Sequence, residues 1–278
     1  DYESGHIPGA INIPLHTFDI PEVPEGIYPW TCPEDGNLKA PEKLKAAIES
    51  YGITHDTMVI VYSGDESYIS GAYRVAWALM YAGVADVRYL NGDLDLWRES
   101  GGEIETVTNT PIAVEDFGAT VPAHPEYYAT TAEVEEMVNN PEAVIGDDRR
   151  WNEYASDDES LACGYEFFCV TGHIATAVWV KNQSWYLDNI YSGNDENSAS
   201  HPATMRSYTE IQKMWSDVGI TTDTEVAFHC GGGWRSSHVW FCAYLMGYEH
   251  ASNYDGGWYE WTWDPSRPVV HGENPSAE

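Results

Sequence analysis

The chain has 278 residues, of which 45 are Asp or Glu and 13 are Lys or Arg, so its formal net charge is −32. Such a surface repels nucleic acid and anionic membranes, and we expect neither as a partner. No apolar run in the sequence is long enough to cross a bilayer, so we also expect no membrane insertion.

One pattern of predicted elements occurs twice along the chain. In the first half, an apolar strand over 58–62 leads through a loop to a helix over 71–82. In the second half, a strand over 226–229 leads through a glycine-rich loop to a helix over 237–246. Short apolar strands that alternate with helices predict an α/β fold with a mainly parallel sheet flanked by helices. A chain of this length is expected to form two domains.

The boundary between the repeats is expected within 106–128, which is rich in Pro, Thr and Ala and has weak periodicity. We assign residues 1–110 to an N-terminal domain, 111–128 to a linker and 129–278 to a C-terminal domain.

The loop after the second strand carries the clearest chemical signal in the chain. Cys230 is followed by three glycines, then by Trp234 and Arg235, and then by two serines. Glycines let successive backbone N–H groups point inward, and the N-terminus of the following helix adds partial positive charge. A cysteine held there ionises easily, and the thiolate is its reactive form. The alternative is a buried structural cysteine, but a structural turn seldom needs three glycines.

The spacing within this loop separates two kinds of chemistry. Four residues, from Gly231 to Trp234, lie between the cysteine and Arg235. Tyrosine-phosphatase-like enzymes place one residue more there, which makes a ring wide enough for a phosphoryl group. The tighter ring favours a single sulfur atom carried on Cys230.

Four segments resemble the motifs of rhodanese-type sulfurtransferases. The sequence Cys230-Gly-Gly-Gly-Trp-Arg-Ser is similar to the active-site motif Cys-x-x-Gly-x-Arg-Ser of that family. The other three segments are 1–14 (with Gly-His-Ile-Pro-Gly-Ala), 147–154 (with Asp-x-Arg-x-x-x-Glu-Tyr) and 255–261 (Asp-Gly-Gly-Trp-Tyr-Glu-Trp). A departure is found at 172–177, where the usual Pro-Gly after Gly-His-Ile is absent.

The resemblance to the tandem-domain members, the thiosulfate and 3-mercaptopyruvate sulfurtransferases, implies two tandem rhodanese-like domains. In the N-terminal domain, Ser63 stands at the position of the nucleophile, and a serine cannot carry a persulfide. We therefore expect this domain to be inactive and the C-terminal domain to be catalytic. Because Asp1 already lies inside the first motif, we expect the sequence to lack the first strand and helix of the N-terminal domain.

The remaining cysteines bear on the cellular compartment. Cys163 and Cys169 are close enough in sequence to form a disulfide, and a metal site with His173 is the alternative. Cys242 is expected in the core of the following helix, and Cys32 gives no signal. Together with the acidic surface, a disulfide favours a periplasmic or secreted protein over a cytoplasmic one.

The sequence thus predicts a sulfurtransferase that moves sulfane sulfur from a thiosulfate-like anion to a thiol, cyanide or sulfite through a Cys230 persulfide. No cofactor and no metal are expected. The residues expected to bind substrate are Gly231, Gly232, Gly233, Trp234, Arg235, Ser236, Ser237 and Arg149, and for Arg149 a structural ion pair is the competing role. The alternatives are a sulfur carrier or assembly protein without turnover, and a phosphatase or arsenate reductase.

Overall fold

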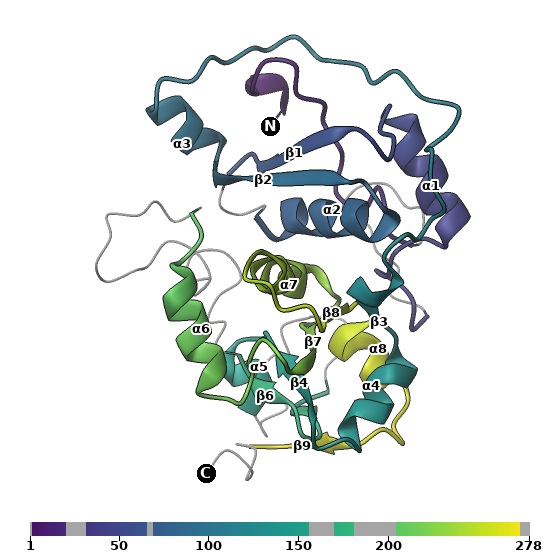
Figure 1. The fold of residues 1–278 in the computed structure, drawn as a ribbon, viewed down its shortest axis with the longest axis vertical. Helices are drawn as coiled ribbons and strands as arrows, with labels where there is room; N and C mark the ends of the chain where they lie inside the picture. The colour runs from purple at the N-terminus through teal and green to yellow at the C-terminus, as the bar shows by residue number, and fades with distance from the viewer. Residues whose placement is uncertain (1, 21–31, 66–68, 156–169, 181–203, 273–278) are drawn as a thin grey trace.

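The structure of the protein is a computed structural model that describes residues 2–20, 32–65, 69–155, 170–180 and 204–272. Its two halves lie one above the other in Figure 1, and helices α2 and α7 pack against each other where the halves meet.

The N-terminal half is built around a two-stranded parallel sheet. Its elements are η1 (Tyr2–Ser4), α1 (Pro41–Ser50), β1 (Met58–Ser63), α2 (Ile69–Ala82), β2 (Asp86–Asp93) and α3 (Leu94–Glu99). Strands β1 and β2 pair in parallel with Val59 opposite Val87. Helix α1 starts with a proline, which suits the first turn, and it buries Leu44 and Ile48 one turn apart.

The C-terminal half contains a larger parallel sheet with the strand order β3-β8-β7-β4-β6. Its strands are β3 (Tyr128–Ala129), β4 (Ala143–Asp147), β6 (Val178–Trp179), β7 (Glu225–His229) and β8 (Ala251–Tyr254). Its helices are η3 (Pro125–Tyr127), α4 (Thr131–Val138), α5 (Trp151–Ala155), α6 (Tyr208–Ser216), α7 (Trp234–Leu245) and α8 (Gly257–Trp263). An antiparallel pair, β5 (His173–Ile174) with β9 (Val269–Val270), completes this half. The predicted mainly parallel α/β fold is confirmed.

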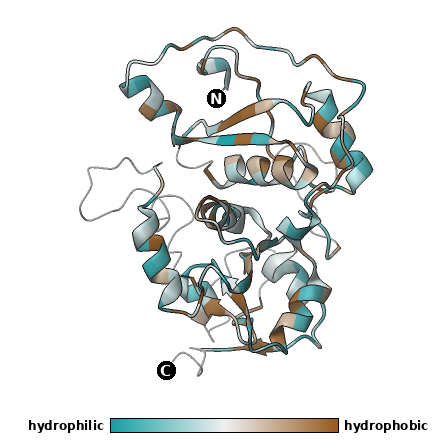
Figure 2. Cartoon of the chain, in the orientation of Figure 1, coloured by the Kyte–Doolittle hydropathy of each residue, from teal (hydrophilic) through white to brown (hydrophobic). Residues whose placement is uncertain are grey.

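The central strand β7 places the cysteine loop at the carboxyl edge of the sheet. Val226, Ala227 and Phe228 are fully buried, as expected for a strand that is covered on both faces. Figure 2 shows brown, hydrophobic stretches in the sheet of this half and teal, hydrophilic stretches on helices α4 and α6. Because β4 and β7 run in parallel and Asp147 lies opposite His229, the loops that follow both strands emerge side by side.

The largest apolar core crosses between the halves. It joins Leu44 and Trp77 of the first half to Trp215, Phe228 and Phe241 of the second. The domain boundaries at 110 and 128 stay a prediction, although residues 111–124 contain no helix or strand. Within the described ranges, none of the helices has the length and hydropathy that spanning a membrane would require.

Candidate active site

The Cys230 loop turns directly from strand β7 into helix α7. Gly233 caps the helix with φ +76°, a left-handed conformation that favours glycine. Helix α7 begins at Trp234, so the predicted start at Ser237 was wrong by three residues. The earlier start places Ser236 in the first turn, where backbone N–H groups have no partner inside the helix.

Backbone N–H groups converge on the Cys230 sulfur, as the sequence predicted. The backbone N–H groups of Gly232 and Ser236 donate to the sulfur, and the Ser236 hydroxyl lies 3.7 Å from it. The cysteine is fully buried. Burial by itself raises the pKa of the Cys230 thiol, but the Arg235 guanidinium and these donors outweigh it, so that the pKa is lowered. The geometry therefore favours an ionised sulfur.

Arg235 is held in place by a carboxylate from another element. Its two terminal nitrogens donate to Glu153 of helix α5 at 2.9 and 3.0 Å, and both side chains are buried. Burial raises the pKa of Glu153, but the guanidinium outweighs this effect and keeps the pKa below its ordinary value. This bidentate pair fixes the cation whose charge lowers the pKa of Cys230. The sequence analysis missed this role of Glu153, although the residue lies in one of the recognised motifs.

The first residues of helix α8 orient the peptide groups of the loop. The N–H of Trp258 donates to the Cys230 carbonyl at 2.8 Å, and the N–H of Tyr259 donates to the Gly231 carbonyl at 2.9 Å. In a trans peptide the C=O and N–H groups point in opposite directions. The bond from Tyr259 therefore turns the N–H of Gly232, which belongs to the same peptide group, toward the sulfur.

The other predicted loop residues have distinct contacts. The hydroxyl of Ser237 donates to the Gly233 carbonyl at 2.6 Å, and Asn253 donates to the same oxygen at 3.1 Å. The ring of Trp234 lies 4.5 Å from that of His16 in the N-terminal half. Substrate binding by Ser237 and Trp234 stays a prediction.

Arg149 makes the structural ion pair that the sequence analysis weighed against substrate contact. It is fully buried, donates to Asp147 at 2.6 Å and to the Gly172 carbonyl at 2.7 Å, and stacks over Trp258. These contacts join strand β4 to helix α8. A contact of Arg149 with substrate stays a prediction.

His229 touches the backbone of the nucleophile. Its Nδ1 lies 3.0 Å from the Cys230 carbonyl oxygen, and its Nε2 lies 3.5 Å from Asp147. Burial lowers the pKa of His229, so the ring is neutral near pH 7.

The other cysteines lie apart from these contacts. Cys163 and Cys169 fall outside the described residues. Cys242 is buried in α7, as expected, and burial raises the pKa of its thiol. The thiol of Cys32 lies 3.0 Å from Asp35, and that carboxyl raises the pKa of Cys32 to about 11. Among the described residues, no three His, Cys, Asp or Glu side chains are grouped as metal ligands.

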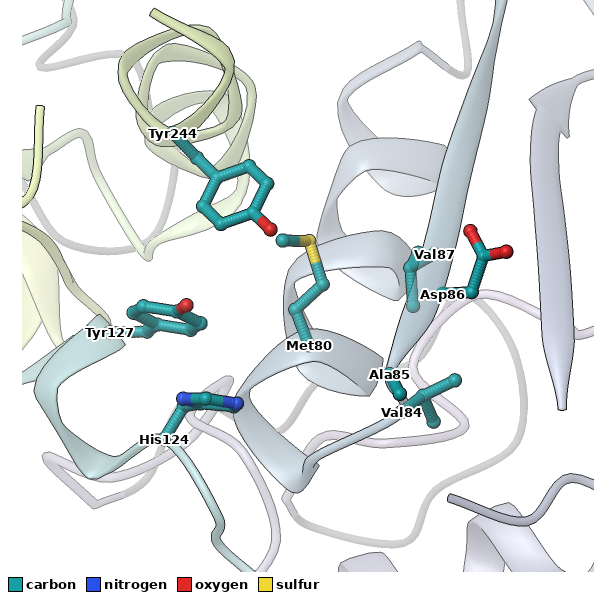
Figure 3. A pocket seen from close by; sticks show the side chains of 8 residues that line it. All are labelled: Met80, Val84, Ala85, Asp86, Val87, His124, Tyr127 and Tyr244. Carbon is teal, nitrogen blue, oxygen red and sulfur yellow. The ribbon is translucent and has the colours of Figure 1, made fainter. Parts of the chain in front are cut away.

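A surface pocket of about 150 Å³ lies away from this chemistry. Figure 3 shows the side chains that line it, which come from α2, β2, the turn between them and the segment around η3, with Tyr244 from the far end of α7. These residues are Met80, Val84, Ala85, Asp86, Val87, His124, Tyr127 and Tyr244. None belongs to the Cys230 loop, so the pocket has no part in the site.

Comparisons with known proteins identify the family of the chain. The model of the rhodanese-like domain matches residues 1–100 and 130–263. The chain is 35% identical to the thiosulfate sulfurtransferase YnjE of Escherichia coli over 275 residues, which are 98% of this chain and 57% of YnjE. It is 30% identical to the sulfur carrier protein TtuD of Thermus thermophilus over 276 residues, covering 98% of this chain and 87% of TtuD.

Solved structures of EanB have the same fold. The wild-type EanB structure matches with a TM-score of 0.84 and 35% identity, over 98% of this chain and 61% of EanB. Another EanB structure, described as carrying a cysteine persulfide with ergothioneine, has a TM-score of 0.84 and 34% identity over 98% of this chain and 62% of EanB. The chain thus spans less than two thirds of the length of YnjE and of EanB.

Proposed function

Since the chain belongs to the family of rhodanese-like domains, we propose that it is a sulfurtransferase. It moves a sulfane sulfur atom from a thiosulfate-like anion to a thiophilic acceptor through a persulfide on Cys230. The observation that carries this proposal is the convergence of two backbone N–H groups and the Arg235 cation on one sulfur whose pKa is lowered.

In the first step the Cys230 thiolate attacks the outer sulfur of thiosulfate. The new S–S bond forms as the S–S bond of thiosulfate breaks, and sulfite leaves with the electron pair. The persulfide that remains carries one negative charge on its terminal sulfur. The N–H groups of Gly232 and Ser236 already donate to the Cys230 sulfur, which is one S–S bond from this charge, and their partial positive charge stabilises it.

In the second step an acceptor attacks the terminal sulfur of the persulfide. Cyanide then leaves as thiocyanate, sulfite as thiosulfate and a thiolate as a persulfide, and in each case the Cys230 thiolate is regenerated. Two half-reactions that share one covalent intermediate predict ping-pong kinetics.

Intact-protein mass spectrometry after thiosulfate treatment tests the proposal. We expect a mass gain of one sulfur atom, no gain in Cys230→Ser, and loss of the added atom when cyanide is supplied. Cys32→Ser is the matched control, because this half-buried thiol is bonded to Asp35 rather than to the loop, and it should gain sulfur like the wild type. A gain that persists in Cys230→Ser, or no gain in the wild type, would contradict the proposal.

A sulfur carrier without turnover is the second candidate, and the similarity to TtuD supports it. Carrier and enzyme both form the persulfide, but only the enzyme releases thiocyanate repeatedly from thiosulfate and cyanide. Multiple turnovers per protein molecule favour the enzyme, and a single release favours the carrier. A phosphatase or arsenate reductase is disfavoured by the four-residue spacing, and hydrolysis of an aryl phosphate would be its signature.

We also propose a location outside the cytoplasm, periplasmic or secreted. The support is the net charge of −32 and the close sequence spacing of Cys163 and Cys169. Fractionation of the source cells, with thiol labelling before and after reduction, tests both points. A cytoplasmic protein with two free thiols at these positions would contradict the proposal.

A further inference from the structure

A buried group of charges from the N-terminal half reaches the loop of the C-terminal half. Arg74 of α2 is 3% exposed, and its guanidinium donates to Asp19 at 3.0 and 3.1 Å and to the Gly36 carbonyl at 3.1 Å. Its remaining nitrogen donates to Asp255, which follows β8 in the other half. The second oxygen of Asp255 accepts the N–H of Leu38 at 2.7 Å. Asp255 is therefore held from the N-terminal half on both of its oxygens.

Asp255 lies against the cysteine loop itself. A Cβ atom added to Gly233 would come within 2.5 Å of the Asp255 carboxylate and 3.0 Å of the Arg74 guanidinium. A Cβ atom on Gly257 would lie 2.7 Å from the Cys230 carbonyl oxygen. The segment 255–259 thus follows the loop at backbone contact distance, and only glycines fit at these two positions.

This segment also supplies the two N–H groups that orient the loop peptides. Trp258 and Tyr259 bind the carbonyl oxygens of Cys230 and Gly231. A shift of the segment would rotate the peptide group between Gly231 and Gly232 and turn its N–H away from the sulfur. The position of Asp255 therefore controls whether that N–H can stabilise a charge on Cys230.

We propose that Arg74, which comes from the half without the cysteine, is a positioning residue for sulfur transfer. Through Asp255 it fixes the segment 255–259, which in turn directs the N–H of Gly232 at the sulfur. The inference rests on the proposed function, because it assigns Arg74 a role in that reaction.

Positioning and direct electrostatics predict opposite changes in the pKa of Cys230 when Asp255 is replaced by alanine. Above pH 6, where Asp255 is ionised, removal of this nearby anion would, by charge alone, favour the Cys230 thiolate. Loss of positioning disfavours the thiolate, because the N–H of Gly232 turns away. In this variant Arg74 keeps Asp19 as its partner, so no buried cation is left unpaired.

The experiment measures the ultraviolet absorbance of the thiolate against pH, each time as the difference from the same protein carrying Cys230→Ser. In both Asp255→Ala and Arg74→Met we expect the Cys230 titration to move to higher pH, with about tenfold less thiolate at a given pH above 6 and below the wild-type midpoint. The rate of sulfur loading from thiosulfate at that pH should fall by about the same factor. Arg88→Met is the matched control, since it removes an exposed cation of the same half that pairs with Asp86, and it should titrate like the wild type.

An unchanged or lower titration midpoint in folded Asp255→Ala would overturn the inference. If Arg74→Met fails to fold, Asp255→Ala alone decides. The titration needs no sulfur donor, so it tests the positioning role of Arg74 independently of the proposed sulfur transfer. Absence of persulfide in the wild type would contradict sulfur transfer, whereas absence of a shift in Asp255→Ala would contradict positioning.

Discussion

The carboxyl ends of β1 and β7 occupy equivalent places in the two halves. Each of these parallel strands leads through a loop into a helix, and those two helices, α2 and α7, pack together. In the C-terminal loop, Cys230 receives backbone N–H groups and faces Arg235. In the N-terminal half, Ser63 at the end of β1 is 2% exposed and lies beside Tyr89.

The helices that follow these loops use their arginines differently. Arg235 of α7 binds Glu153 within its own half, next to the sulfur. Arg74 of α2 instead reaches across to Asp255 in the other half. The strand–loop–helix scaffold alone therefore does not make a site. One copy carries the reactive sulfur, and the other contributes a buried cation that supports it.

Removal of the Arg235 cation should slow the loading of sulfur onto Cys230 more than any other change considered below. This cation is the strongest influence that lowers the pKa of Cys230, so Arg235→Met should slow sulfur loading at pH 6 by about 10- to 100-fold. The loading rate can be followed by quenched mass spectrometry. Because the single variant leaves Glu153 buried without its partner, Arg235→Met/Glu153→Gln is the better comparison. Wild-type loading in that double variant would show that the cation has no role.

A methyl group at Gly233 should destabilise the protein more than one at a similar glycine elsewhere. Gly219 has φ +84° and nothing within 4 Å of an added Cβ, so Gly219→Ala should cost only the backbone strain, about 1 kcal/mol. Gly233→Ala adds contact with Asp255 and should cost about 2–3 kcal/mol. Urea unfolding of both variants measures the difference. Equal costs would mean that the contact of the Cys230 loop with Asp255 tolerates displacement.

The charges between the halves should make stability depend on pH. Burial raises the pKa of Asp255 from its ordinary value of 3.8 to about 6, against the opposing effect of Arg74. Between these values the folded protein holds a proton on Asp255 that the unfolded chain has released. The stabilisation that comes from binding this proton is therefore lost as pH rises toward 6.

Asp255→Asn removes the titrating group and is the control for this effect. From pH 5 to pH 7 the wild type should lose on the order of 1 kcal/mol more stability than this variant. Chemical denaturation at several pH values gives both curves. Parallel curves would show that Asp255 does not titrate in this range.

A cysteine at position 63 should not restore sulfur loading to a protein that lacks Cys230. In Ser63→Cys/Cys230→Ser we expect no gain of sulfur from thiosulfate, because Arg235 and the loop amides remain in the other half. Mass spectrometry of the intact double variant checks this expectation. A full sulfur atom on this variant would show that the two loops are equivalent and would contradict the claim that only the C-terminal half makes a site.

The elements of both repeats could be predicted from the sequence, because the apolar runs at 58–62 and 226–229 are distinct local signals. The reactive loop could be predicted for the same reason, since its three glycines are contiguous with Cys230. The start of α7 was placed wrongly because Ser236 and Ser237 resemble a helix cap. Gly233 takes that position instead, with a left-handed backbone.

The partners of the two arginines could not be predicted from the sequence. Glu153 lies 82 residues before Arg235, and Asp255 lies 181 residues after Arg74. Which carboxylate meets which guanidinium depends on how α5 packs on the loop and how the halves pack together. No local pattern encodes either arrangement.

The most direct test of the central claim is the titration of the Cys230 thiolate by ultraviolet absorbance, taken as the difference between wild type and Cys230→Ser. The arrangement of Gly232, Ser236 and Arg235 predicts a midpoint below about 8.5, the value of an unperturbed cysteine. A midpoint at or above that value would mean that burial dominates, and it would contradict an ionised sulfur poised to accept a second one.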